Sequence, residues 1–248
     1  METYKKFYNG ILKYSILLLF IMFISARMQA SPPMRKINKC NTFNVYIKVA
    51  KHKRICTKEV SVDDYAFFCY IMRQYYGEYS EKYLSIIPDT ITFKRVYGYS
   101  FPLKGNEARY DGESFHQYIQ RLMCTPMSII SRQQAEAYCQ WMEFGVGKER
   151  QSSKWHYSLP AEADYERIVK KAKLTTQHPL ELMKKKKYVL TGITDNVAEY
   201  TQDGKIVKGG ASKDLTFCDI DDVCNIETPV GFRLLIVKKN KKQEGKNE

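Results

Sequence analysis

The stretch 195-DNVAEYTQDGKIVKGG-210 joins a short polar loop to a strand-like segment and ends on two adjacent glycines. Two further segments accompany it, 158-SLPAEADYERI-168 upstream and 230-VGFRLL-235 downstream. In the upstream segment Pro160 suits the first turn of a helix, and Glu162 and Asp164 are favourable at its positive end. The downstream segment opens the apolar run GFRLLIVKK, which we expect to form a central strand of a sheet.

These segments follow a helix-like stretch that ends 135-AEAYCQW-141, and their order resembles that of the formylglycine-generating, or sulfatase-modifying factor, superfamily. The family pattern is A-x-x-Y-C-x-W, R-L-P-T-E-A-E-W-E, N-V-W-E-W, R-G-G-S and G-F-R, and all five blocks have counterparts here in that order. YLSIIPDTITF and CTPMSIISRQQAEAYCQW are most similar to the members associated with gliding motility and type IX secretion. The resemblance implies a bacterial envelope protein and an α+β fold of the C-type-lectin-like kind, loop-rich, with short antiparallel sheets and about three helices.

Local signals predict several elements directly. Ser61 and Asp64 form a capping box ahead of a helix over 62–75, and Ser131 and Gln134 form another ahead of a second helix. Alternating runs at 42–50 and 55–60 predict a β-hairpin. The segment 77–126 is rich in tyrosine, proline and glycine without sustained periodicity, so we expect long ordered loops and short strands there.

The chain divides into three regions by composition. Residues 1–30 resemble a secretory signal peptide, because lysines precede an apolar run at 14–24 that is too short for a comfortable membrane span, and Ala30 offers a cleavage position. Residues 31–237 are expected to form a single domain, and residues 238–248 a basic disordered tail. The expected location is therefore the periplasm or the exterior, with membrane anchoring as the alternative if the signal stays uncleaved.

The formal net charge of +13 comes largely from clustered lysines. Such clusters suit a polyanion, for example an anionic glycan or lipid headgroups, or else form a solvated loop and tail. Secretion makes nucleic acid a poor partner, while the tail or an uncleaved signal offers contact with a membrane. The residues concerned are Lys184, Lys185, Lys186, Lys187, Lys238 and Lys239.

Seven cysteines, an odd number, occur in a chain expected in an oxidising compartment, so at least one thiol must stay free or pair outside the chain. Cys69 and Cys139 lie in amphipathic helical patterns and are expected to be buried. Cys218 and Cys224 lie in a polar, acidic loop after the paired glycine. The oxidase members of the superfamily bind copper(I) through two such cysteines, spaced C-x4-C, to convert a substrate cysteine to formylglycine.

The spacing here is C-x5-C, and the residues between the two cysteines are acidic, which disfavours thiolate. A local disulfide and two unpaired thiols are the alternatives to a copper pair. The iron-dependent branch of the superfamily needs converging histidines, and the four histidines of this chain are scattered.

The resemblance also implies roles for the other blocks. By motif match Asn196, the Val197 carbonyl and Glu199 would hold calcium, or Asn196 and Glu199 would satisfy buried backbone groups. Glu162 is expected to support neighbouring loops, and Arg233 to be a buried cation paired with an acidic residue such as Glu162 or Glu199. Gly209 and Gly210 are expected to be structural.

The leading functional hypothesis is a non-catalytic protein of this fold that binds or assembles with a protein partner at the bacterial envelope. Nineteen tyrosines offer both core and recognition surface. The alternatives are a copper-dependent formylglycine-generating oxidase and a polyanion-binding module. The oligomeric state is left open.

Overall fold

The computed structural model describes residues 46–103, 112–146, 154–171, 173–175, 189–191, 197–209, 215–219 and 229–239. The chain divides into two compact units, Met1–Thr42 and Phe43–Glu248. The predicted signal peptide lies in the first unit, outside the described residues. Among the residues that are described, no helix is long and apolar enough to cross a membrane.

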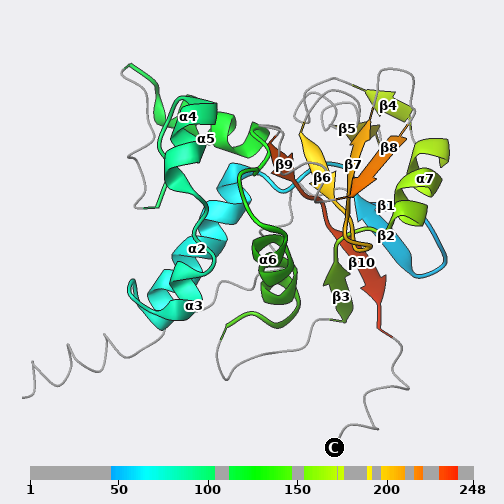
Figure 1. Cartoon of the computed structure of the whole chain (residues 1–248), viewed down its shortest axis with the longest axis horizontal. Helices are drawn as coiled ribbons and strands as arrows, with labels where there is room; N and C mark the ends of the chain where they lie inside the picture. The colour runs from blue at the N-terminus through cyan, green and yellow to red at the C-terminus, as the bar shows by residue number, and fades with distance from the viewer. Residues whose placement is uncertain are drawn as a thin grey trace, which may run out of the picture. The chain divides into compact units, whose positions relative to one another are not determined.

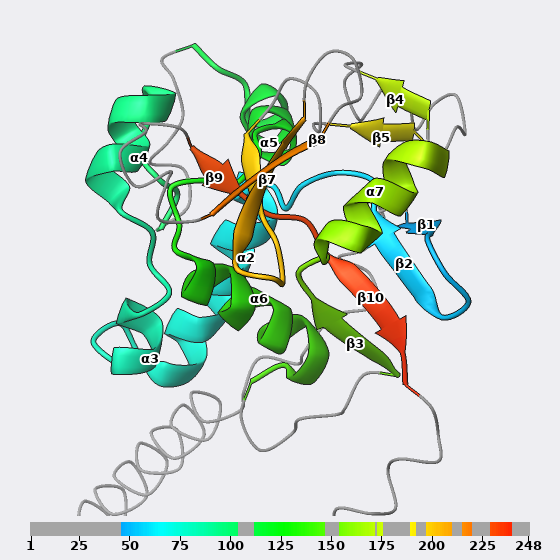
Figure 2. The same cartoon turned by 45° about the vertical axis from the view of Figure 1, so that its right-hand side comes forward.

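Within the second unit, helices α2–α6 gather beside the strands, and α7 lies on the strand side (Figures 1 and 2). The capping boxes predicted at Ser61 with Asp64 and at Ser131 with Gln134 are both formed. The helices are α2 (Val62–Tyr76), α3 (Glu81–Leu84), α4 (Thr90–Tyr97), α5 (Phe115–Cys124), α6 (Arg132–Phe144) and α7 (Glu162–Lys171).

The prediction of loops and short strands over 77–126 was wrong, because α3, α4 and α5 all lie in this segment, and the described residues therefore hold six helices where about three were expected. Each of the three begins at a residue whose side chain caps it, Ser80, Asp89 and Ser114 respectively. A four-residue and an eight-residue helix contain too few turns to produce a visible apolar period. Their stability comes from caps and from packing against the rest of the fold.

The first sheet has the order β1-β2-β10-β3, and all its neighbouring strands are antiparallel. The predicted hairpin is present, with Tyr46 opposite Cys56. The C-terminal strand β10 is interior, as expected from its apolar sequence, and Leu235 lies between Ile55 and Ser158. The strands are β1 (Tyr46–Lys48), β2 (Lys53–Cys56), β3 (Trp155–Ser158) and β10 (Leu235–Lys238).

The second sheet has the order β8-β7-β6-β9, and its β6–β9 pair is parallel. A separate two-stranded pair, β4–β5, is parallel as well, so the expectation of antiparallel sheets holds only in part. The strands are β4 (Lys173–Thr175), β5 (Val189–Thr191), β6 (Ala198–Tyr200), β7 (Lys205–Gly209), β8 (Leu215–Asp219) and β9 (Val230–Gly231).

The apolar run at 231–239 is divided between the two sheets, because β9 ends at Gly231 and β10 begins at Leu235. Gly231 approaches other backbone so closely that a Cβ placed there would lie 2.7 Å from the Met127 carbonyl oxygen. Phe232 and Leu234, in the connection, are buried in the main core. This connection carries Arg233, the residue on which the site below is built.

Aromatic rings form the centre of the main core, between α2, α6 and the connection from β9 to β10. Tyr65 stacks on Tyr138 with ring centroids 5.9 Å apart, and the Tyr138 ring meets Phe68 and Phe232 edge-on. A smaller core packs α7, through Tyr165 and other residues, against β2, β7 and β10. Many of the tyrosines therefore fill the core.

Candidate functional site

A buried polar cluster joins the two sheets and α7. The Arg233 side chain is fully buried, and its Nε and Nη2 atoms donate to the two carboxylate oxygens of Glu199 at 2.6 and 2.5 Å. Its Nη1 donates to the carbonyls of Cys56 and Thr57, both at 3.2 Å. The Tyr165 hydroxyl donates to Glu199 Oε2 at 2.7 Å. Arg233 therefore has an acidic partner, as the sequence predicts: Glu199 forms the hydrogen-bonded pair, and a second buried carboxylate, Glu59, lies 3.8 Å from Nη2.

The electrostatics of this cluster favour a fixed ion pair. Burial alone would lower the pKa of Arg233, but the charge and hydrogen bonds of Glu199 outweigh it and hold that pKa above its ordinary value. Burial raises the pKa of Tyr165 well above its ordinary value, and the Glu199 carboxylate raises it further. Both groups therefore keep their protons at neutral pH. Since the cluster is buried, we assign it a structural role: it fixes β6 and α7 to the connection between β9 and β10.

The predicted calcium ligands are only partly described. Asn196 lies outside the described residues, and the side chain of Glu199 is engaged by Arg233 and Tyr165. Among the described residues, no group of three or more His, Cys, Asp or Glu side chains is placed to hold a metal ion. Glu199 accepts from two buried side chains, which differs from the buried backbone donors that the sequence offered as its alternative role.

Glu162 supports a neighbouring turn, the kind of role that the family resemblance implies. Its carboxylate lies 2.8 Å from Lys205 Nζ, and its backbone N–H donates to Asp203 Oδ2 at 2.8 Å. The hydrogen bond and charge of Glu162 raise the pKa of Lys205. Gly209 ends β7 opposite Leu215, and Gly210 lies outside the described residues.

The two candidate oxidase cysteines are not both described. Cys218 lies within strand β8, opposite Ile206, and not in a loop as the sequence suggests, while Cys224 falls outside the described residues. Cys218 is partly exposed and forms no disulfide with any of the other cysteines that the structure describes. Cys69 and Cys139 are buried free thiols, as predicted, and burial raises the pKa of each well above its ordinary value.

The lysine clusters are only partly described, because Lys184, Lys185, Lys186 and Lys187 lie outside. Strand β10 includes Lys238, so the folded part continues past the predicted boundary at residue 237. Lys239 Nζ lies 2.6 Å from Oε1 of the buried Glu143, whose Oε2 lies 2.6 Å from His156 Nδ1. The charge of Lys239 is thus offset within the protein, which weakens its predicted role toward a polyanion.

The surface of the helices differs from that of the strands. Among the described residues, every large apolar side chain that is exposed belongs to α2–α6 or to a connection between them. Phe67 and Tyr70, one helical turn apart on α2, form part of this surface. We call it the helical apolar surface. It comprises Phe67, Tyr70, Tyr75, Tyr79, Leu84, Ile91, Val96, Phe115 and Phe144.

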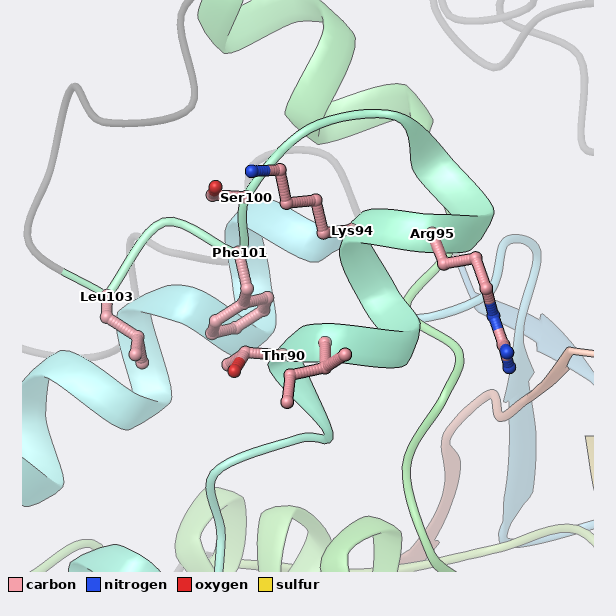
Figure 3. A pocket seen from close by; sticks show the side chains of 7 residues that line it. Thr90, Lys94, Arg95, Ser100, Phe101 and Leu103 are labelled. Atoms are coloured by element: carbon pink, nitrogen blue, oxygen red, sulfur yellow. The ribbon is translucent and has the colours of Figure 1, made fainter.

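A cavity of about 660 Å³ opens beside α4, next to this surface. The Phe101 ring is 2% exposed and lies beside Thr90, while the Lys94 side chain reaches toward Ser100 (Figure 3). The cavity is lined by Thr90, Ile91, Lys94, Arg95, Ser100, Phe101 and Leu103. Sequence reasoning missed this site because it treated the segment as a loop. The pattern DTITFKR, a capping residue followed by two apolar and two basic positions, was the available signal.

Comparisons with family models, with curated proteins and with solved structures find no match to this chain.

Proposed function

We propose that this chain is a non-catalytic binding or assembly protein of the bacterial envelope, built on a C-type-lectin-like scaffold of the sulfatase-modifying-factor kind. The order of the five motif blocks and the mixed α/β architecture support the scaffold. The signal-like sequence at residues 1–30 supports export to the periplasm or the exterior. The protein would act by docking a protein partner on its helical apolar surface.

The observation that carries this proposal is the segregation of exposed apolar side chains to the helices. Tyr79 is 89% exposed and Ile91 83%, whereas the described strands and α7 present no exposed large apolar residue. Scattered exposed apolar residues are common on proteins, but here all those among the described residues lie on α2–α6 or the connections between them, and apolar patches that collect on one part of a protein are typical of interaction surfaces. Tyrosine is also among the residues that contribute most binding energy at interfaces.

Site-specific photo-crosslinking tests the docking surface. A photoreactive amino acid at Tyr70 should yield a discrete adduct with an envelope protein in bacteria that export the chain. The same group at Glu166, an exposed residue of α7, is the matched control and should yield none. Equal adducts from both positions, or none from Tyr70 and Ile91, would contradict the proposal.

The oxidase alternative requires a separate experiment. The purified chain, loaded with copper(I), is incubated with a cysteine-containing sulfatase peptide, and formylglycine is measured by mass spectrometry. We expect no turnover, because the acidic C-x5-C segment does not match the pattern of the oxidases. Turnover that disappears with Cys218→Ser would establish an enzyme in place of a binding protein.

A further inference from the structure

We propose that the cavity beside α4 binds an acidic peptide segment of the protein partner, with one large apolar side chain of that segment inserted between Ile91 and Phe101. This inference rests on the proposed function, since it names the chemistry of the partner that docks on the helical apolar surface. It depends on the shape of the cavity, on the charge around it and on the rigidity of its walls.

The lining of the cavity suits a large apolar anchor beside a negative charge. Ile91, Phe101 and Leu103 supply apolar surface, and Thr90 and Ser100 supply hydroxyl groups. A volume of about 660 Å³ lies within the ordinary range for ligand pockets, which is roughly 300–1,000 Å³. Because Ile91 is 83% exposed, the cavity is open at that edge and admits a side chain carried on a continuous chain.

The lining of the cavity carries two cations, Lys94 and Arg95, and the charge of Arg95 also acts on Asp89, the cap of the same helix. Lys94 and Arg95 are both exposed, and neither forms an ion pair with a described residue. Arg73, by contrast, pairs with Glu78 at 2.9 Å. The Lys94 cation at an apolar opening is complementary to a carboxylate that follows or precedes an apolar residue, while the Arg95 side chain points away from Lys94 and Phe101 (Figure 3).

The walls of the cavity are held in place before any partner arrives. Asp89 caps α4 by accepting from the backbone N–H groups of Ile91 and Thr92, both at 3.0 Å. The Phe101 ring packs edge-on against Phe93 with centroids 5.2 Å apart. A preformed site loses less conformational entropy on binding, so a short segment can bind with useful affinity.

An acidic peptide fits the surroundings better than an anionic membrane does. Residues 62–103, which hold α2, α3 and α4, contain five acidic and four basic side chains, so this part of the chain carries no net positive charge toward a bilayer. Binding to anionic lipid normally depends on clusters of four to eight basic residues. The positive charge is local to the cavity, as recognition of a short segment requires.

The inference can be tested by selecting peptides from a random twelve-residue library displayed on phage, with the full chain immobilised. Enriched peptides should carry Asp or Glu next to Phe, Leu or Trp. Their dissociation constants, measured by fluorescence polarisation, should rise about tenfold or more with Lys94→Glu and with Ile91→Ser, because each change removes one side of the complementarity. Lys82→Glu, the same charge reversal on α3, is the matched control and should change the constants less than about threefold.

Several outcomes would overturn the inference. No enrichment, enrichment without acidic residues, or equal binding to the Lys94→Glu and Lys82→Glu variants would each do so. Cosedimentation with phosphatidylglycerol vesicles that is lost with Lys94→Glu would assign the cavity to a membrane. Peptides that lose affinity for the Tyr70→Ser variant but not for the Lys94→Glu variant would refute binding in the cavity and leave the proposed function standing. Peptides whose affinity is unchanged by either substitution would contradict both the cavity inference and the proposed function.

Discussion

Replacing Arg233 by methionine should destabilise the fold more than any exposed charge substitution in this chain. The guanidinium is fully buried and is the partner of both carboxylate oxygens of Glu199. Methionine fills a similar length but offers no donor. The Glu199 carboxylate, itself only 1% exposed, would be left as a buried charge with the Tyr165 hydroxyl as its remaining hydrogen-bond donor among those described above.

The magnitude follows from these contacts. Breaking a buried ion pair by removing one partner costs about 3–5 kcal/mol. The carbonyls of Cys56 and Thr57 also lose a donor, and each such loss costs about 0.5–1 kcal/mol. The expected total of roughly 4–7 kcal/mol is a large part of the stability of an ordinary domain, which is about 5–15 kcal/mol.

Urea unfolding followed by the fluorescence of Trp141 and Trp155 measures the loss. The matched control is Arg73→Met, which breaks the partly exposed pair with Glu78 and should cost less than about 1 kcal/mol. Combining Arg233→Met with Glu199→Gln removes the nearer of the two carboxylate charges that lose Arg233, the other being Glu59, but keeps an acceptor for Tyr165. The double variant should therefore be at least about 1 kcal/mol more stable than Arg233→Met alone.

Two results would refute this reasoning. One is a loss for Arg233→Met no larger than that for the Arg73→Met control. The other is a double variant whose loss equals the sum of the two single losses, which would show that Arg233 and Glu199 are not coupled. If Arg233→Met does not fold, the coupling of Arg233 and Glu199 can still be tested with Glu199→Gln and the double variant. The double variant must then fold where Arg233→Met alone does not.

Further predictions follow from other contacts. Gly231→Ala should lower the free energy of unfolding by about 1–3 kcal/mol, because the alanine Cβ would press on the Met127 carbonyl. An unchanged urea midpoint would contradict this close approach. Ser131→Ala should cost about 1 kcal/mol by removing the cap of α6, measured in the same way, and a cost near zero would contradict that role. Burial alone would raise the pKa of Glu143, but Lys239 and other neighbours lower that pKa overall. The ionised Glu143 carboxylate therefore stabilises the fold above its unfolded pKa of about 4.3. This stabilisation is lost as the pH falls through the lower pKa of the folded state. The stability difference between the wild type and Glu143→Gln should therefore narrow between pH 5 and pH 3, and a constant difference would refute this assignment.

Local signals were sufficient for the elements whose stability is encoded nearby in the chain. The capping boxes at Ser61 and Ser131 locate the starts of α2 and α6 because both partners of each box lie within four residues. The interior position of β10 follows from its apolar sequence. Helices α3–α5 escaped prediction, because short helices show caps but no apolar period.

The candidate site shows the same limit. The motif blocks identified Arg233 as a buried cation and named Glu199 and Glu162 as its candidate partners. Only the tertiary structure separates the two, because Arg233 and Glu199 are 34 residues apart and are brought together by the pairing of β6 with β9. The cavity beside α4 was not predicted at all, since exposure depends on which elements pack over a side chain.

By itself, then, the sequence determined where the principal helices start, that β10 is interior and that Arg233 must be paired. Each of these three features depends on neighbours in the chain or on the cost of burying a charge. Neither of these two causes requires knowledge of the topology. The tertiary structure decided the partner of Arg233, the division of the final apolar run at Gly231 and the collection of exposed apolar side chains on one layer. These features arise from contacts between distant segments, and such contacts form only when the strands have paired.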